Sequence, residues 1–446
     1  MALGGGNFIS HNKILPGAYI NFVSAAHATA SLSDRGYAAM PLELGWGIEN
    51  EVFTVTSEEF QKNSQKIFGY PYTHERMKGL RDLFINASTL YVYRLDSGGE
   101  KASNTYATAL YGGVRGNDLR ISIQQDVDDE SKWDVITYLG SEKADIQTVS
   151  EPGELTSNSY VEFKTDFTFE AVAGAPLSGG TNGEVTGNSY QLFLDRIESY
   201  SYNTMGVVTT DDTIKKLFIS FNKRLRDEMG IKFQLVIYNY KKADYMGVVS
   251  IKNKCTDGAY KEKDGSMVYP DEAAAVYWTT GALAGCSASA SCQNRVYDGS
   301  YNIDAAYTQQ ELASAIQAGE FVFHLVSGDV RVLDDINTMV TVTDTCGDVF
   351  KSNQTVRVID QIANDDAVLF NTKYLGKVPN DAAGRTALWA DLVKIRQELQ
   401  VLRAIENFSE TDVAVSQGST KKSVIVESTV TVVNAMSKLY MTVTVA

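Results

Sequence analysis

The spacing of apolar residues along this chain of 446 residues predicts amphipathic helices separated by short, strongly apolar strands. Over Asp211–Met229 the apolar residues share one face behind an acidic capping residue, which makes this the clearest helix. Further helices are predicted over Ser57–Phe68, His74–Phe84, Tyr307–Ala318 and Thr386–Phe408. Strands are predicted over Thr89–Tyr93, Lys232–Tyr240 and Phe321–Val326. This alternation favours an α/β region whose sheet is parallel or mixed and covered on both faces.

A different pattern occupies the middle of the chain. Short runs that alternate apolar and polar residues, such as Leu119–Ile123, Val135–Leu139 and Tyr160–Phe163, are separated by turn-rich segments. Strands of this length and spacing are typical of an antiparallel β-sandwich. The segment from Asp96 to Arg196 also has seventeen acidic and seven basic residues, which is a net −10 of the total charge of −15. We therefore predict an inserted, acidic, all-β domain.

Charge and cysteine usage exclude several kinds of partner and site. A net charge of −15 argues against nucleic-acid binding and against docking on an anionic membrane, because both need clustered positive charge. The four cysteines form no Cys-x-x-Cys pair, so we expect reduced thiols, as in a protein made in the cytosol, and no zinc site. No signal peptide is expected at the start. The uncharged run Ala273–Asn294 consists mostly of Ala, Gly, Ser and Thr, and we interpret it as a buried helix followed by a loop.

The motifs of enzyme active sites are missing from the chain. Neither a phosphate-binding loop nor a Gly-x-Ser-x-Gly elbow occurs, and none of the four histidines is placed as an obvious general base. The acidic run Asp126–Glu130 resembles a calcium loop, but Ser131 stands where that loop needs glycine, so a solvated turn is expected. We predict no catalytic residue, no cofactor and no metal site.

Both ends of the chain have an extended pattern. Ala18–Val23 is predicted as a strand, and apolar residues alternate with polar ones over Leu439–Val445. A strand that runs to a terminus needs a sheet edge, either in its own subunit or in a neighbour's, and the pattern leaves both open. The candidate residues are Ala18, Tyr19, Ile20, Asn21, Phe22, Val23, Leu439, Tyr440, Met441, Thr442, Val443 and Val445.

Several short runs, spread in order from end to end, resemble the contractile phage tail sheath family. The resemblance is to the type found in defective prophages and R-type bacteriocins of Gram-positive bacteria. The runs are Leu15–Phe22, Arg35–Pro41, Tyr111–Asn117, Asp335–Thr338, Arg357–Asp365, Gly376–Val378 and Lys438–Val443.

The resemblance implies a fold of several domains. It implies a subtilisin-like α/β core domain, an inserted antiparallel β-sandwich domain, and an α+β C-terminal assembly domain with extended terminal arms. Mapped onto this chain, the parts are an N-terminal arm (1–24), the first part of the core (25–95), the sandwich (96–196), the α/β domain (197–345), the assembly domain (346–437) and a C-terminal arm (438–446). The subtilisin-like label describes a fold and carries no activity with it.

The resemblance also implies a function and partners. Such a subunit polymerises as stacked, hexameric rings around a tail tube and contracts to drive the tube through a target cell envelope. Its partners are copies of itself, the tube protein, and the baseplate and terminator proteins. The terminal arms are exchanged between neighbouring subunits, and the particle is a virion tail or a bacteriocin assembled in the host cytoplasm. Four residues are hypothetical tube-facing charges: Lys377, Arg385, Lys394 and Arg396.

Two other functions remain open on the sequence. One is a non-contractile surface or virion structural protein that uses the same strand exchange. The other is an α/β hydrolase-like enzyme, which the missing nucleophile and base disfavour.

Overall fold

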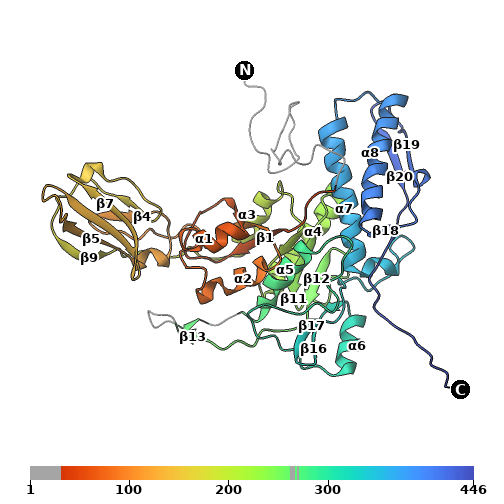
Figure 1. Cartoon of the computed structure of the whole chain (residues 1–446), viewed down its shortest axis with the longest axis horizontal. Coiled ribbons are helices and arrows are strands. Elements are labelled where there is room, and N and C mark those ends of the chain that lie inside the picture. Colours follow the sequence, from red (N-terminus) through yellow and green to blue (C-terminus); the bar gives the residue numbers. More distant parts are fainter. Residues whose placement is uncertain (1–31, 262–266, 269–270, 446) are drawn as a thin grey trace. The chain divides into compact units, whose positions relative to one another are not determined.

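The computed structural model describes residues 32–261, 267–268 and 271–445. The chain forms two compact units (Figure 1). The smaller unit comprises residues 39–78 and 89–198, and the larger unit comprises 79–88, 199–446 and the residues before 39.

In the smaller unit, three strands lie side by side in the order β1, β3, β2. They are β1 (Tyr37–Leu42), β2 (Val52–Thr56) and β3 (Thr89–Arg94), and the helices of this unit are α1 (Ser57–Phe68) and α3 (Gly187–Ile197). Strand β2 pairs antiparallel with β3, with Val52 opposite Tyr93. Helix α1 begins and ends where the sequence predicts, because Thr56 and Glu59 form a capping box and Gly69 adopts the left-handed conformation that ends the helix.

The β-sandwich belongs to the same unit and confirms the prediction for the middle of the chain. One sheet has the order β7-β6-β5-β9 and is antiparallel throughout, and β4 pairs with β8. Alternate residues of β5 and β6, among them Leu119, Ile121 and Val135, form a buried cluster that also contains Trp46. The strands are β4 (Ala107–Ala109), β5 (Leu119–Gln125), β6 (Trp133–Leu139), β7 (Glu142–Val149), β8 (Val161–Phe163) and β9 (Val172–Pro176).

The larger unit contains a parallel sheet of four strands in the order β15-β12-β11-β10. Helix α4 packs on β11, and the almost entirely buried α5 packs on β10 and β11, which confirms an α/β arrangement. The elements are α2 (Lys78–Phe84), β10 (Thr204–Gly206), α4 (Asp212–Arg224), β11 (Gln234–Tyr238), β12 (Val248–Ile251), β13 (Tyr260–Lys261), β14 (Met267–Val268), α5 (Ala275–Gly285), α6 (Gln309–Gln317), β15 (Glu320–Phe321), β16 (Phe323–Val326) and β17 (Asp329–Val332). Within the described residues, no helix combines the length and apolarity needed to cross a bilayer.

The C-terminal part of this unit is built on two long helices, α7 and α8. Antiparallel partners follow them in the chain: β19 pairs with β20, and β18 with β21. Apolar residues of both helices, such as Leu369, Leu388 and Leu392, pack with Val413 of β19. The elements are α7 (Asn353–Leu369), α8 (Ala382–Val401), β18 (Ile405–Glu406), β19 (Val413–Gln417), β20 (Val424–Ser428) and β21 (Thr431–Val432).

Two predicted elements are wrong in detail. The helix predicted over Thr386–Phe408 begins one turn earlier, at the Asp381 cap, and ends at Val401. The chain turns at Arg403, which has a φ of 59°, so that Ile405 can pair with Val432. The single strand predicted over Phe321–Val326 is split at Val322, since β15 pairs with β12 while β16 forms a hairpin with β17.

Candidate assembly site

Helix α7 buries an unusual number of polar side chains. Burying a polar group costs free energy unless it is paired, so these side chains require partners on the surrounding elements. The buried polar residues of α7 are Asn353, Gln354, Thr355, Arg357, Asp360, Gln361 and Asp365.

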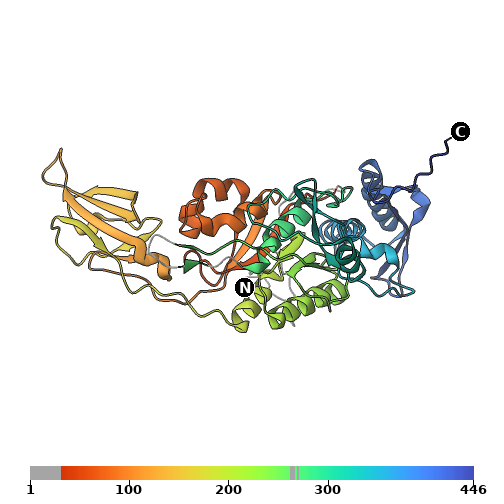
Figure 2. The ribbon, with the colours of Figure 1, turned by 90° about the horizontal axis from the view of Figure 1, so that it is seen from below.

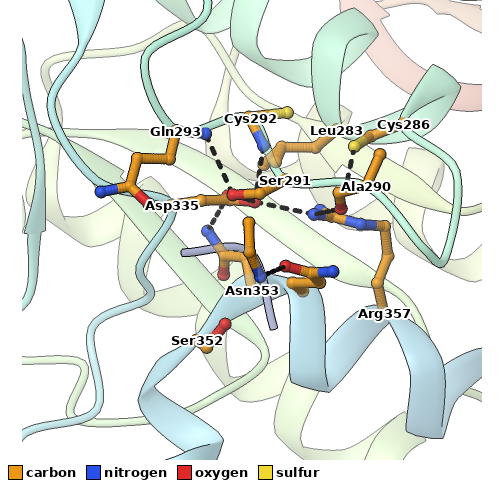
Figure 3. Close-up of polar contacts among 12 residues, drawn as sticks. Leu283, Cys286, Ala290, Ser291, Cys292, Gln293, Asp335, Ser352, Asn353 and Arg357 are labelled. Carbon is orange, nitrogen blue, oxygen red and sulfur yellow. Dashed lines mark hydrogen bonds and ion pairs between the residues drawn. The ribbon is translucent and has the colours of Figure 1, made fainter. Parts of the chain in front are cut away.

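The Arg357 guanidinium pairs with the Asp335 carboxylate, which precedes α7 in the chain (Figure 3). Their side chains are 1% and 2% exposed, and Arg357 Nη2 lies 2.7 Å from Asp335 Oδ2. The Cys292 backbone N–H donates to the same oxygen at 2.9 Å, and Asn353 Nδ2 donates to Asp335 Oδ1 at 3.0 Å. Burial acts to lower the pKa of Arg357, but the surrounding charges, that of Asp335 first among them, together with the hydrogen bond to Asp335 raise it. The attraction between the guanidinium and the carboxylate offsets part of the cost of burying them.

A second buried pair joins α7 to the end of α4. Arg226 lies in the turn that follows α4, and its guanidinium makes two hydrogen bonds to Asp360, at 2.6 and 2.8 Å. Burial acts to lower the pKa of Arg226, but the charge of Asp360, the hydrogen bonds to it and the interaction with Tyr245 together raise it. Two hydrogen bonds between one guanidinium and one carboxylate fix the direction of the contact as well as its length. They hold α7 in one orientation against the end of α4.

A third pair joins α7 to α8 and corrects one prediction. Arg396 was expected to face a tail tube, but its side chain is only 2% exposed, and it donates twice to Asp366, at 2.6 Å each. A buried and paired guanidinium cannot present its charge on a surface, so Arg396 is a structural residue of the α7–α8 contact.

The other three predicted tube-facing residues lie closer to solvent. Lys377 is exposed and donates to the Thr372 carbonyl oxygen at 2.6 Å. Arg385 is half-buried near the start of α8, and the exposed Lys394 lies 3.9 Å from Glu398 on the same helix. No carboxylate pairs with Lys377 or Arg385 in the part of the chain that the structure describes, so these two cations are available to another molecule.

The first described residues lie on α7 and α8. The Leu32 backbone N–H donates to Glu398 on α8 at 3.0 Å, and the Ser33 hydroxyl donates to Asp365 at 2.5 Å. The predicted arm residues Ala18–Val23 lie outside the described residues.

The C-terminal tail is anchored at one end and extended at the other. The Ala435 N–H donates to Gln354 at 2.9 Å, and Asn434 exchanges hydrogen bonds with Thr355, so the anchor is the first turn of α7. From Met436 to Val445 the tail forms no hydrogen bond with the described part of the chain, and in two views it ends clear of the other segments of its unit (Figure 1; Figure 2). The predicted arm residues Leu439, Tyr440, Met441, Val443 and Val445 are 70–90% exposed.

The hairpin β19–β20 has two open edges. In the described part of the chain each of its strands pairs only with the other, and β20 exposes Ile425 and Val426. An exposed strand edge carries unpaired N–H and C=O groups and accepts an added strand readily. Within the described residues, the C-terminal part of the chain thus contains an extended tail without a hydrogen-bonded partner and a hairpin with open edges.

The buried pairs explain what sequence reasoning missed. In the sequence, Arg35, Asp335 and Arg357 stand out only as members of runs that resemble the tail sheath family. The structure brings these runs together: Arg35 donates to the Cys286 carbonyl oxygen at the end of α5 and to Gln361 on α7, near the Arg357–Asp335 pair. The sequence signal for a buried ion pair is a charged residue inside an otherwise apolar pattern. This signal does not identify the partner, because the paired residues are far apart in the chain.

Comparisons with known proteins agree with this architecture. Four family models cover most of the chain: the tail sheath protein Gp18 domain III N-terminal region at 35–95, and the phage tail sheath protein beta-sandwich domain at 97–182. The phage tail sheath protein central domain matches 183–338, and the phage tail sheath C-terminal domain matches 346–446.

Relatives match over nearly the whole length. The phage-like element PBSX protein XkdK of Bacillus subtilis is 32% identical over 99% of this chain and 100% of its own. The crystal structure of a sheath tail protein from Desulfitobacterium hafniense is 34% identical, covers 95% of this chain and 99% of its own, and superposes with a TM-score of 0.80. The contracted helical sheath of the anti-feeding prophage shares the fold alone, at 12% identity, 97% and 99% coverage and a TM-score of 0.55. This chain belongs to the phage tail sheath family.

Proposed function

We propose that the chain is the subunit of a contractile tail sheath, which polymerises around a tail tube and contracts to drive the tube through a target cell envelope. Membership of a family of structural proteins supports this, as does a fold shared with a contracted helical sheath. The alternatives of a non-contractile surface protein and of a hydrolase-like enzyme have no comparable support.

One observation carries the proposal: among the residues that the structure describes, neither the tail from Met436 to Val445 nor the hairpin β19–β20 has a further strand partner. Ten extended residues at about 3.3 Å each reach roughly 33 Å, which is long enough to cross a subunit boundary. If the tail of one subunit pairs with the hairpin edge of the next, the contact is heterologous and repeats into a helical filament. Backbone pairing at the tail would keep subunits linked while their globular parts repack during contraction.

The remaining parts of the proposal rest on the family. Ala18–Val23 supply a second exchanged strand. The hydrogen bond of Leu32, the first described residue, to Glu398 on α8 is consistent with this. Lys377, Arg385 and Lys394 face the tube, and the copies form stacked hexameric rings that meet baseplate and terminator proteins. The particle is a virion tail or a bacteriocin assembled in the host cytoplasm, and the parallel sheet with α4 and α5 represents a subtilisin-like core.

Removal of Leu439–Ala446 tests the proposal directly. Because Leu439–Val445 form no hydrogen bond with the rest of the described chain and their apolar side chains are 70–90% exposed, the shortened protein should keep its circular dichroism spectrum and its unfolding temperature. It should form no tubes or stacked rings in negative-stain electron micrographs, whereas the full chain should. Tubes of unchanged length from the shortened protein would contradict the proposal.

A pair of matched variants tests whether the tail acts as a strand. Met441 and Val443 lie on one face of an extended segment, and Thr442 and Thr444 lie on the other. Met441→Lys with Val443→Lys should abolish polymerisation, because charge on the buried face of a docked strand is expensive. Thr442→Lys with Thr444→Lys should be tolerated. Equal effects of the two pairs would show that side-chain direction, and hence strand pairing, does not matter.

A further inference from the structure

Two residues from opposite ends of the chain, Ser33 and Ala435, bind to the same helix, α7. Ser33, next to the first described residue, donates to Asp365 near the end of the helix. Ala435, where the C-terminal tail begins, donates to Gln354 in the first turn. The two contact points are eleven residues apart on a continuous helix, which at a rise of about 1.5 Å per residue places them about 16 Å apart along its axis. Helix α7 therefore sets the separation of the two chain ends.

Both contacts lie on one face of α7. Four residues of this face are spaced by four, three and four positions, which places their side chains in a row along one side of an α-helix. All four are buried, and we call this row the α7 strip: Gln354, Val358, Gln361 and Asp365. The two chain ends therefore dock on one strip rather than on unrelated faces of the helix.

The far end of the α7 strip binds every polar group of Ser33. The Asp365 carboxylate accepts from the Ser33 N–H at 3.3 Å and from its hydroxyl at 2.5 Å. Gln361 Nε2 donates to the Ser33 carbonyl oxygen at 3.2 Å, to its hydroxyl oxygen at 2.7 Å and to Asp365 at 2.7 Å. A fully satisfied network of this kind is rigid, so both the position and the direction of the backbone are fixed at Ser33.

The near end of the α7 strip fixes the start of the C-terminal tail. Gln354 Oε1 accepts from the Ala435 N–H at 2.9 Å, while its Nε2 donates to the Ser289 carbonyl oxygen at 3.1 Å. With both ends of its amide bonded, Gln354 has one orientation. The adjacent Thr355 hydroxyl adds hydrogen bonds with the Asn434 side chain, at 3.1 and 3.3 Å. The point from which the tail leaves is therefore set by the first turn of α7.

An apolar cluster between these two contacts joins the chain ends to each other. Val358, in the middle of the α7 strip, is 0% exposed and belongs to a buried cluster with residues that follow α8. Leu32 packs against this cluster from the N-terminal side, and Val430 and Val432 pack against it from the segment that leads to the tail. The strip and this cluster therefore hold both chain ends in one packed unit.

We propose that the α7 strip is the surface that positions both exchanged arms of a sheath subunit, with Gln354, Gln361 and Asp365 as its positioning residues. This rests on the proposed function, because strand exchange requires the arms to leave each subunit at defined points. A strand that arrives one residue out of register turns its apolar side chains to the wrong face of the sheet. The strip prevents such slips by fixing where each arm begins and how far apart the two starting points lie.

Hydrogen–deuterium exchange of the soluble full chain, followed by mass spectrometry, tests the α7 strip before any polymer forms. Asp365→Leu removes the acceptor of Ser33 and should speed exchange of the Ser33 N–H about tenfold, because a protecting hydrogen bond is lost. Gln354→Leu should have the same effect at Ala435. Asp365→Asn keeps one acceptor oxygen for the Ser33 hydroxyl and should retain most of the protection.

Asn364→Ala is the matched control on the same helix. Asn364 exchanges two hydrogen bonds with the Lys232 backbone, at 2.9 and 3.3 Å, and in the described residues it bonds to neither chain end. The substitution should lower the unfolding temperature about as much as Asp365→Leu does, because it also removes hydrogen bonds between α7 and another segment. It should leave exchange at Ser33 and Ala435 unchanged.

Tube formation in negative-stain micrographs completes the test. Asp365→Leu and Gln354→Leu should each lose most of the tubes that the natural chain forms, and Asn364→Ala should lose none. The positioning role is overturned if exchange at the chain ends is unchanged in both strip variants, if these variants form tubes in natural yield, or if the control acts as strongly as they do. Tubes from the chain that lacks Leu439–Ala446 would instead disprove strand exchange itself, so the two failures are distinguishable.

Discussion

Each of three arginines, Arg226, Arg357 and Arg396, is buried against a carboxylate, and every one of these pairs includes a residue of α7. Taking two charges out of water costs free energy that their attraction only partly returns, so such pairs specify an arrangement more than they stabilise it. The individual charges are visible in the sequence. Their pairing is not, because the partners are 134, 22 and 30 residues apart and meet only when the domains fold.

Asp335→Asn tests this view at a single residue. The substitution keeps the shape of the side chain but leaves the Arg357 charge buried without its carboxylate, which should reduce the free energy of unfolding by about 3–5 kcal/mol. Urea unfolding followed by circular dichroism measures the loss.

Asp348→Asn is the matched control. Asp348 pairs with Lys351, but its side chain is 84% exposed, and breaking an exposed pair should change stability by less than about 1 kcal/mol. Equal effects of the two substitutions would mean that burial of the Arg357 pair has no energetic importance.

At the scale of elements, the sequence predicts the ends of a helix where neighbouring residues in the chain determine them. Local signals surround α1 and α4: Thr56 caps α1, the predicted acidic cap of α4 is Asp211, which accepts from the Thr213 N–H at 2.6 Å, and Gly230 ends the turn after α4 with a φ of 75°. The end of α8 and the split after β15 could not be predicted in this way. Ile405 continues the helical spacing of α8, yet it pairs with Val432, and that pairing depends on residues far along the chain.

The capping box of α6 should contribute measurably to the stability of that helix. The Thr308 hydroxyl accepts from the Glu311 N–H at 3.3 Å, and Glu311 accepts from the Thr308 N–H at 2.8 Å. Thr308→Ala should cost about 1 kcal/mol and speed amide hydrogen exchange over Gln309–Gln317. Thr386→Ala, inside α8, should have no such effect, since its hydroxyl bonds only to the Ala382 carbonyl oxygen of its own helix. Unchanged exchange in α6 would mean that tertiary packing alone holds the helix.

At the scale of the whole molecule, the sequence predicted the family and an inserted β-sandwich, and the comparisons confirm both. The change of pattern and charge near Asp96 indicated an inserted sandwich. What it could not indicate is how closely the two ends of the insertion approach. The Gly183 N–H donates to the Asp96 carbonyl oxygen at 3.0 Å, and Thr181 N–H donates to that of Glu100 at 3.1 Å.

This closeness predicts that the sandwich can be removed. A chain in which two glycines replace Ser97–Asn182 should fold, because the linker has to span only one hydrogen-bonded pair of segments. The variant also carries Trp46→Gln, since the Trp46 side chain packs into the sandwich cluster and would otherwise be uncovered. Calorimetry should show the larger unit unfolding at its original temperature.

The control is Trp46→Gln in the full chain. It should destabilise the smaller unit by about 3–5 kcal/mol, because a large buried side chain is lost from the cluster. A shortened chain without cooperative unfolding would show that the sandwich is required for the rest to fold.

The anchor of the C-terminal tail has a mechanical consequence. A neighbour that pulls on the tail loads Asn434 and Ala435, which are tied to the first turn of α7 through Thr355 and Gln354. Two residues beyond Thr355, Arg357 joins α7 to Asp335. Tension on the tail would therefore pass from α7 into the α/β region through a charged side-chain contact. The tail forms no hydrogen bond with the described part of the chain, whereas the Arg357–Asp335 ion pair is buried. An applied force would therefore straighten the tail before it strained the fold.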